Sequence, residues 1–96
     1  MAKYILLINW TEQGVKNVKD SPKRLDAARK LAETAGAKMG DFYMTMGGYD
    51  MVVHVEAPDD ATVARFVLNL AGAGNVRTQT LKAFSEDEYR KILGAL

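Results

Sequence analysis

The side chains best suited to acid–base chemistry lie within one short stretch of this chain. His54 is the only histidine, and Asp50 and Glu56 stand at even spacings on either side of it. Because alternate residues of a strand share one face, these three groups are expected on the same side of a sheet. An imidazole beside a carboxylate can form an acid/base pair, but such groups also occur in structural networks at protein interfaces. Their spacing matches no recurrent ligand motif, so we expect no metal site.

A Gly-Gly pair predicts how the strand that carries His54 meets its neighbour. Gly47 and Gly48 suit a two-residue hairpin loop, because positive φ costs glycine little. That loop places the pairs Met46–Tyr49, Met44–Met51 and Phe42–Val53 on one face, which we expect to be the core, and Tyr43–Val52 and Asp41–His54 on the other. A one-residue slip would mix apolar and polar partners. The second face therefore carries the interface or acid/base candidates, which are Asp41, Tyr43, His54 and Glu56.

Two further segments supply candidates for ligand binding. Trp10, Thr11 and Glu12 follow the first apolar strand, and a Trp at a strand end followed by polar residues can cover a cleft between helices and a sheet. The alternative is a Trp that closes the end of the core. Tyr49 and Asp50 follow the turn, where they either line the mouth of a pocket or serve the structure, with Asp50 capping the turn and Tyr49 packing on the core.

Hydrophobic periodicity predicts the elements that position these residues. Strands are expected at about residues 2–10, 37–46, 49–57 and 75–84, with a bulge at Gly40 and a loop over residues 11–20. Ser21-Pro22 begins the first helix and Gly36 follows its end, Pro58-Asp59-Asp60 begins the second, and Ser85 to Glu88 form a capping box for a third. The order βαββαβ with a C-terminal helix predicts an α+β, ferredoxin-like fold with a four-stranded antiparallel sheet, in one domain of residues 1–96.

The first strand is apolar on both of its faces. If Tyr4, Leu6 and Ile8 face the helices, then Ile5 and Leu7 lie on the helix-free face. An apolar patch of this kind is costly to leave in water and indicates a partner. The simplest partner is a second copy placed sheet to sheet about a two-fold axis.

Composition excludes several classes of function. The net charge is +1, from 13 basic and 12 acidic residues, so the charge excess of a nucleic-acid-binding protein is missing. No apolar run has the length of a membrane helix or a signal peptide. The chain has no cysteine, which excludes disulfides, zinc–thiolate sites and thiol nucleophiles and fits a cytoplasmic location. We expect no nucleic-acid partner, no membrane partner and no cofactor.

The chain resembles the GYD family, small proteins named for a Gly-Tyr-Asp turn. The resemblance covers nearly the whole chain and is carried by Leu7 to Gly14, Gly48-Tyr49-Asp50, Glu56 to Asp60, Gly74 to Thr78 and Ala83-Phe84. It implies a place in the dimeric α/β-barrel group of ferredoxin-like folds, and it transfers no catalytic residue. His54 departs from the family pattern, which implies an aliphatic residue at that strand position.

Two functions are compatible with these observations. The first is a homo-oligomeric module that binds a small ligand or another protein without catalysis. The second is a cofactor-free enzyme of the dimeric-barrel type, resembling a monooxygenase or an isomerase, with its substrate near Trp10, Tyr49 and Asp50 and with His54 as a base. We find no second titratable or nucleophilic group, tyrosines aside, that points toward the helix side of the sheet, which favours the binding module.

Overall fold

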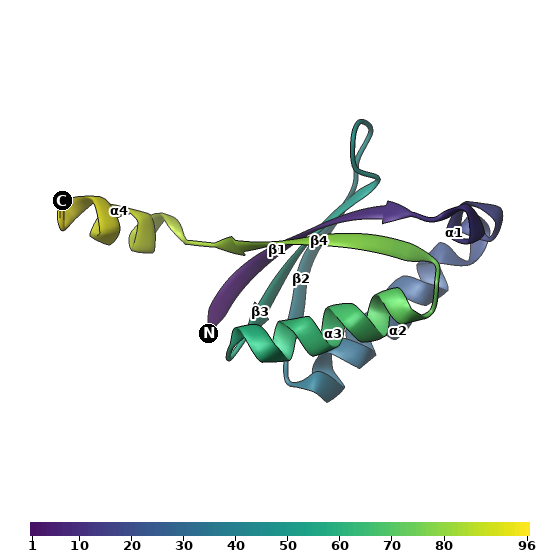
Figure 1. Ribbon diagram of the computed structural model, residues 1–96, viewed down its shortest axis with the longest axis horizontal. Coiled ribbons are helices and arrows are strands. Elements are labelled where there is room, and N and C mark those ends of the chain that lie inside the picture. Colours follow the sequence, from purple (N-terminus) through teal and green to yellow (C-terminus); the bar gives the residue numbers. More distant parts are fainter.

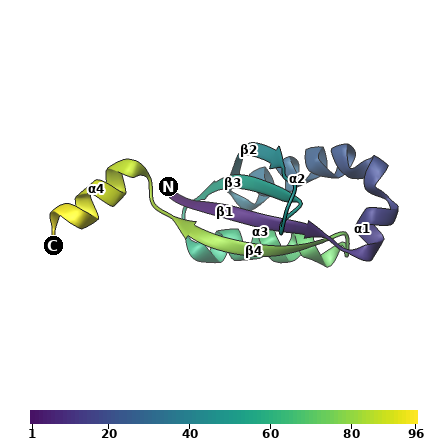
Figure 2. The same cartoon turned by 90° about the horizontal axis from the view of Figure 1, so that it is seen from above.

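The computed structural model describes residues 1–96 as a twisted sheet with two long helices on one face (Figures 1 and 2). The elements are β1 (Ala2–Trp10), α1 (Glu12–Lys16), a 3-10 turn (Val18–Asp20), α2 (Ser21–Ala35), β2 (Lys38–Met44), β3 (Met51–Ala57), α3 (Asp60–Gly72), β4 (Val76–Ala83) and α4 (Glu86–Gly94). The four strands are antiparallel and lie in the order β2-β3-β1-β4. This is the ferredoxin-like α+β fold that the sequence predicts, with a C-terminal helix added.

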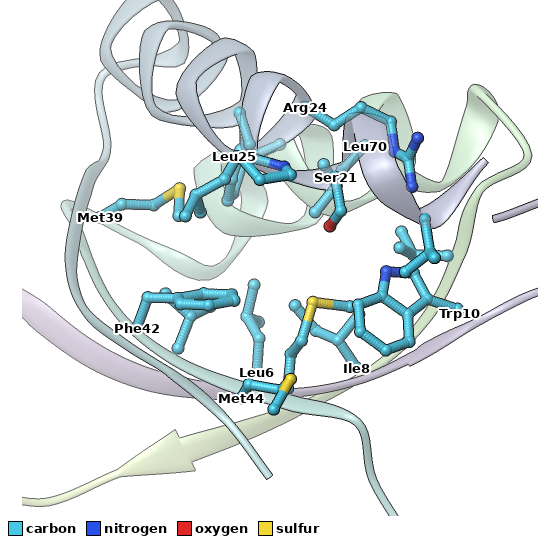
Figure 3. Close-up of a pocket in the computed structure, with 17 residues that line it drawn as sticks. Leu6, Ile8, Trp10, Ser21, Arg24, Leu25, Met39, Phe42, Met44 and Leu70 are labelled. Carbon is cyan, nitrogen blue, oxygen red and sulfur yellow. The ribbon is translucent and has the colours of Figure 1, made fainter. Parts of the chain in front are cut away.

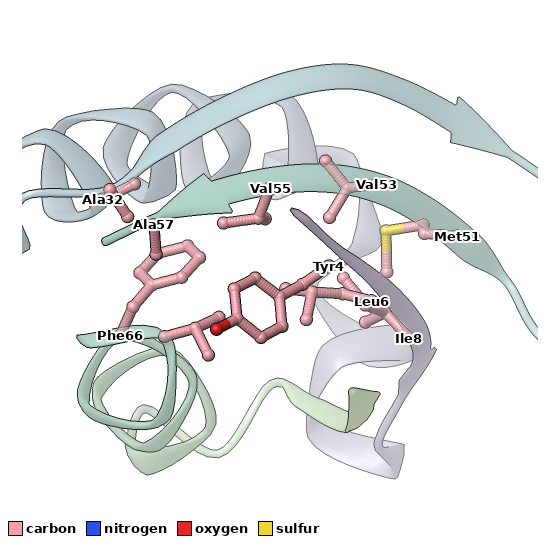
Figure 4. Packing of buried hydrophobic residues seen from close by; sticks show 11 residues of the cluster. Tyr4, Leu6, Ile8, Ala32, Met51, Val53, Val55, Ala57 and Phe66 are labelled. Carbon is pink, nitrogen blue, oxygen red and sulfur yellow. The ribbon is translucent and has the colours of Figure 1, made fainter. Parts of the chain in front are cut away.

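The core lies between the sheet and helices α2 and α3. Tyr4, Leu6 and Ile8 of β1 are buried on the helix side, next to Val53 and Val55 of β3 (Figure 4). Helix α3 contributes Phe66, which is fully buried, and α2 contributes Ala28 and Ala32. Ile5 and Leu7 lie on the opposite face, as the alternation of a strand requires.

The register of the β2–β3 hairpin agrees with the prediction over most of its length. Met44 pairs with Met51, Phe42 with Val53 and Tyr43 with Val52. The register then shifts between Met39 and Phe42, which leaves Gly40 and Asp41 together opposite His54. The bulge expected at Gly40 is therefore present.

The hairpin loop is longer than the predicted two residues. The β2 strand ends at Met44 and β3 begins at Met51, so the pair Met46–Tyr49 does not form, and Met46 is 94% exposed rather than part of the core. Past Met44 the two segments stay joined by the Thr45 N–H, which donates to the Asp50 carbonyl at 2.8 Å, while the Asp50 backbone N–H donates to the carbonyl of Ile8 in β1 at 2.9 Å. The loop rises from the sheet on the side without helices (Figure 1).

The sequence predicts a loop over residues 11–20, but this segment contains α1 and the 3-10 turn. Thr11 caps α1, because its hydroxyl accepts a hydrogen bond from the Gly14 N–H at 3.1 Å. Ser21 is the first residue of α2 rather than its cap. The other predicted boundaries are confirmed: Gly36 ends α2 with φ of 90°, Asp59 caps α3, and Ser85 with Glu88 forms a capping box.

Helix α4 extends away from the rest of the molecule (Figures 1 and 2). None of its residues is buried, and Tyr89, Ile92, Leu93 and the following Leu96 are about half or more exposed. No helix of the fold has the length and apolar character needed to cross a membrane.

Candidate functional site

An apolar cavity of about 330 Å³ lies between α2 and the sheet (Figure 3). Seventeen residues line it and 14 of them are hydrophobic. Leu25 and Ala28 of α2 form one wall, and Met39 and Phe42 of β2 form another. The small side chain of Ala28 leaves room beneath the helix, and Phe66 of α3 also lines the cavity. Its size and apolar lining are those of a small-molecule pocket.

Three polar side chains border this cavity, and none carries a carboxylate. The indole Nε1 of Trp10 is buried and has no hydrogen-bond acceptor, the only buried side-chain nitrogen or oxygen in the chain with this property. Ser21 points its hydroxyl toward the cavity (Figure 3). Arg24 is the only charged lining residue, and its guanidinium donates to the carbonyls of Asn17 at 2.9 Å and Gly14 at 3.3 Å. The cavity thus presents hydrogen-bond donors, among them an unused indole N–H, to whatever occupies it.

The structure brings Trp10 into the cavity but not Thr11 or Glu12. The Thr11 hydroxyl donates to the Gly74 carbonyl at 2.6 Å, and its backbone N–H donates to the Asn75 carbonyl at 3.0 Å. Glu12 is exposed in the first turn of α1. Thr11 therefore anchors α1 to the loop before β4.

Tyr49 and Asp50 lie on the other side of β1 from the cavity. The Asp50 carboxylate accepts a hydrogen bond from the Trp10 backbone N–H at 3.0 Å. The Tyr49 hydroxyl donates to the side-chain carbonyl of Gln79 in β4. The Gly-Tyr-Asp turn thus bridges β1 and β4, and it touches the cavity only through the backbone of Trp10.

The predicted interface residues lie along the helix-free face. The rings of Tyr43 and His54 meet edge to face, with their centroids 6.4 Å apart. Glu56 accepts a hydrogen bond from the Lys3 ammonium at 2.7 Å, and this bond lowers the pKa of Glu56 and raises that of Lys3. Asp41 lies in the bulge opposite His54, and the two side chains share no hydrogen bond or ion pair. No three acidic or histidine side chains gather closely enough to hold a metal ion.

Comparison with known proteins shows to which family this chain belongs. The model of the GYD domain matches residues 4–93. This chain belongs to the GYD domain family. A relative from Thermus thermophilus, named glutamine synthetase and cystathionine beta-lyase binding protein, is 38% identical over 84 residues, which cover 86% of this chain and 88% of the relative.

Solved structures similar to this GYD protein are more distant in sequence. MtbAldR has a TM-score of 0.68 at 17% identity over 88% of this chain and 52% of its own. The feast or famine regulatory protein from M. tuberculosis, complexed with L-methionine, gives 0.64 at 18% over 91% and 54%. A protein of solved structure from Thermus thermophilus gives 0.57 at 23% over 88% and 95%. This chain thus spans about half of the first two proteins, and the likeness shows the shared fold.

The polar and α2-side residues of the cavity are not predicted from the sequence. Arg24 and Ser21 look like ordinary residues of a helix start, and Leu25 and Ala28 like its buried stripe. The one available signal is the set of small side chains on α2, Ala28 and Ala32, opposite large side chains on β2. That signal predicts close packing as readily as a cavity, because it does not give the distance between helix and sheet.

Proposed function

We propose that this GYD protein is a homo-oligomeric interaction module that self-associates through the helix-free face of its sheet. The observation that carries the proposal is an apolar band across that face. Tyr43 pairs with Val52, Val52 with Leu7, and in the adjacent row Ile5 pairs with Leu81. These side chains are partly or largely exposed in the single chain. Burying such a band removes apolar surface from water, which contributes about 25 cal/mol of stabilising free energy per Å² buried.

Helix α4 supplies a second uncovered apolar surface. Tyr89, Ile92, Leu93 and Leu96 recur at helical spacing and share one side of the helix. The helix lies beyond the end of the sheet and does not cover the band within its own chain (Figures 1 and 2). Two apolar surfaces that do not cover each other within one chain can be covered by a second copy.

The shape of the single chain supports a partner. Its radius of gyration is 14.3 Å, whereas a compact chain of this length has a radius of roughly 12.5 Å. The excess arises from α4, which extends outward without a buried residue. A helix that gains so little from its own domain is stabilised mainly by what it packs against elsewhere.

The named relative from Thermus thermophilus supports the wider part of the proposal, which is binding to other proteins. Its name describes a protein that binds glutamine synthetase and cystathionine beta-lyase. We infer that this chain likewise contacts protein partners. Biolayer interferometry against these two enzymes from the same organism as this chain is the first test, with saturable binding expected for at least one. Binding to neither contradicts this part of the proposal.

Sedimentation equilibrium tests the self-association. Wild type is expected to sediment as a dimer or a larger oligomer at micromolar concentration. Leu7→Lys places a charge in the centre of the apolar band and is expected to give a folded monomer. Leu68→Lys is the matched control, because Leu68 is 72% exposed on α3, away from the band. A monomeric wild type, or an oligomeric Leu7→Lys, contradicts the proposal.

Binding of a small molecule is a second candidate function, favoured by the cavity and its unpartnered indole N–H. The cavity lies on the helix side of the sheet, so it is open to a ligand whether or not the helix-free face is covered. The enzyme alternative places a base in the same cleft, yet His54 lies on the opposite face of the sheet. We therefore propose binding rather than catalysis at the cavity.

A further inference from the structure

The cavity under α2 specifies more than the presence of a ligand. Its apolar part is formed by Leu25, Met39 and Phe42, with Leu6 and Ile8 of β1 at its floor (Figure 3). No lining group there offers a hydrogen bond, so this part accepts a hydrocarbon chain or ring and disfavours polar groups. The methionine side chain adjusts readily to the shape of such an occupant.

The polar groups gather at one end of the cavity. Trp10, Ser21 and Arg24 lie together near the start of α2 (Figure 3). The Trp10 Nε1 is a donor without an acceptor, and leaving a buried donor unpaired is unfavourable. The guanidinium of Arg24 uses two of its five N–H groups on backbone carbonyls, which leaves others for a ligand. The Trp10 donor therefore lacks an acceptor, and the positive charge of Arg24 favours one that is anionic.

We propose that the cavity binds a small hydrophobic carboxylate, with its carboxylate at Trp10 Nε1 and Arg24 and its apolar body among Leu25, Met39 and Phe42. The inference rests on the second candidate function above and adds the chemical class of the ligand. The absence of any acidic lining residue agrees with it, because a carboxylate would repel a bound anion.

Octanoate is the probe, with octylamine as its cationic counterpart. Trp10 is the only tryptophan of the chain, so its emission reports occupancy of the cavity directly. We expect octanoate to shift this emission saturably, with a dissociation constant of about 1 mM or below. Octylamine is expected to bind at least about tenfold more weakly, because its ammonium faces Arg24. Equal binding of the two overturns the carboxylate assignment but leaves ligand binding intact, whereas binding of neither overturns both.

Two variants test whether octanoate binds at the proposed site, with its affinity measured by calorimetry. Trp10→Phe keeps an aromatic ring but removes the donor, and it is expected to weaken octanoate about tenfold. Ala28→Leu fills the cavity from α2 and is expected to abolish binding without unfolding the protein. Ala27→Leu makes the same change at an exposed position of the same helix and is expected to bind as wild type. Wild-type affinity in folded Ala28→Leu or in Trp10→Phe overturns the proposed site.

Discussion

The Asp50 carboxylate accepts a hydrogen bond from the Trp10 backbone N–H at 3.0 Å, across 40 residues of sequence. The backbone N–H of Asp50 also donates to the Asn9 side-chain oxygen at 3.1 Å. Together these bonds fix the end of β1, and with it the place where the Trp10 side chain enters the cavity. The Gly-Tyr-Asp turn therefore acts on the cavity through the backbone, and Asp50 is a positioning residue.

Asp50→Ala should lower the free energy of unfolding by about 1.5–3 kcal/mol, because a hydrogen bond to a charged acceptor in a partly buried place is lost. It should also shift the emission of Trp10. Chemical denaturation followed by fluorescence measures both effects. Asp41→Ala is the control, since Asp41 is exposed in the bulge and a change within about 0.5 kcal/mol is expected. Equal effects of the two variants would contradict the positioning role.

Gly14→Ala should destabilise the protein by about 3 kcal/mol, at the upper end of overpacking effects. A Cβ at Gly14 would lie 2.1 Å from the backbone carbonyl oxygen of Asn75, which cannot move aside as a side chain can. Gly48→Ala is the matched control, because a Cβ there meets no atom within 4 Å, and it should change stability by less than about 0.5 kcal/mol. Thermal denaturation of both variants checks this, and a stable Gly14→Ala would contradict the close packing of α1 on this loop.

Stability should fall in acid partly because of Asp59. Hydrogen bonds from the hydroxyl and then the backbone N–H of Thr62 hold the pKa of Asp59 below its usual range. A carboxylate whose pKa is lower in the folded state contributes stability above its unfolded pKa of about 3.9, and this contribution is lost as the pH falls through the folded value.

Asp59→Asn separates the charge of this cap from its hydrogen bond. Asparagine caps a helix about as well as aspartate, so stability near pH 7 should change little. The decline of the unfolding midpoint between about pH 5 and pH 2 should be shallower than in wild type. Asp59→Ala should be less stable than Asp59→Asn at neutral pH. Parallel acid profiles for wild type and Asp59→Asn would show that Asp59 does not contribute to the acid sensitivity.

Removal of α4 should affect self-association much more than folding. A chain that ends at Ser85 keeps every buried residue of the core, because α4 has none. Its urea midpoint should match that of wild type at dilutions where both are monomers. Its dimer dissociation constant should rise by at least about tenfold, since the apolar side of α4 is lost. Arg90→Ala, which breaks only the exposed pair with Glu86, should leave the constant unchanged.

The fold follows from the sequence because its signals are local and agree with one another. The alternation of Tyr4, Leu6 and Ile8 marks the core face of β1, and the capping residues Asp59 and Ser85 mark helix starts. The hairpin register is set by apolar pairing and survives an error in the length of the loop. The bonds of Asp50 to β1, by contrast, are long-range contacts that no local pattern contains.

The sequence predicts only some of the residues that line the cavity. Trp10 stands out because a lone Trp at a strand end is conspicuous. Its neighbours lie outside the cavity, since Thr11 caps α1 and Glu12 lies in the first turn of α1. The sequence predicts Tyr49 near a pocket or the core, whereas its hydroxyl contacts Gln79 on the helix-free side. Arg24 and Ser21 join Trp10 only because α1 and the 3-10 turn bring the start of α2 back over β1. That path depends on tertiary contacts such as those of Thr11 with the loop before β4.

Isotope-filtered NMR on a mixed sample detects contacts between copies of the chain and so tests self-association through the helix-free face. One half of the sample carries labelled methyl groups and the other half does not, so only contacts between copies give cross-peaks. We predict intermolecular cross-peaks from the methyl groups of Leu7, Val52 and Leu81. Two results would contradict self-association through this face. One is a set of intermolecular cross-peaks confined to Leu68 on the outer face of α3, and the other is a sample of monomer mass that gives no intermolecular cross-peaks.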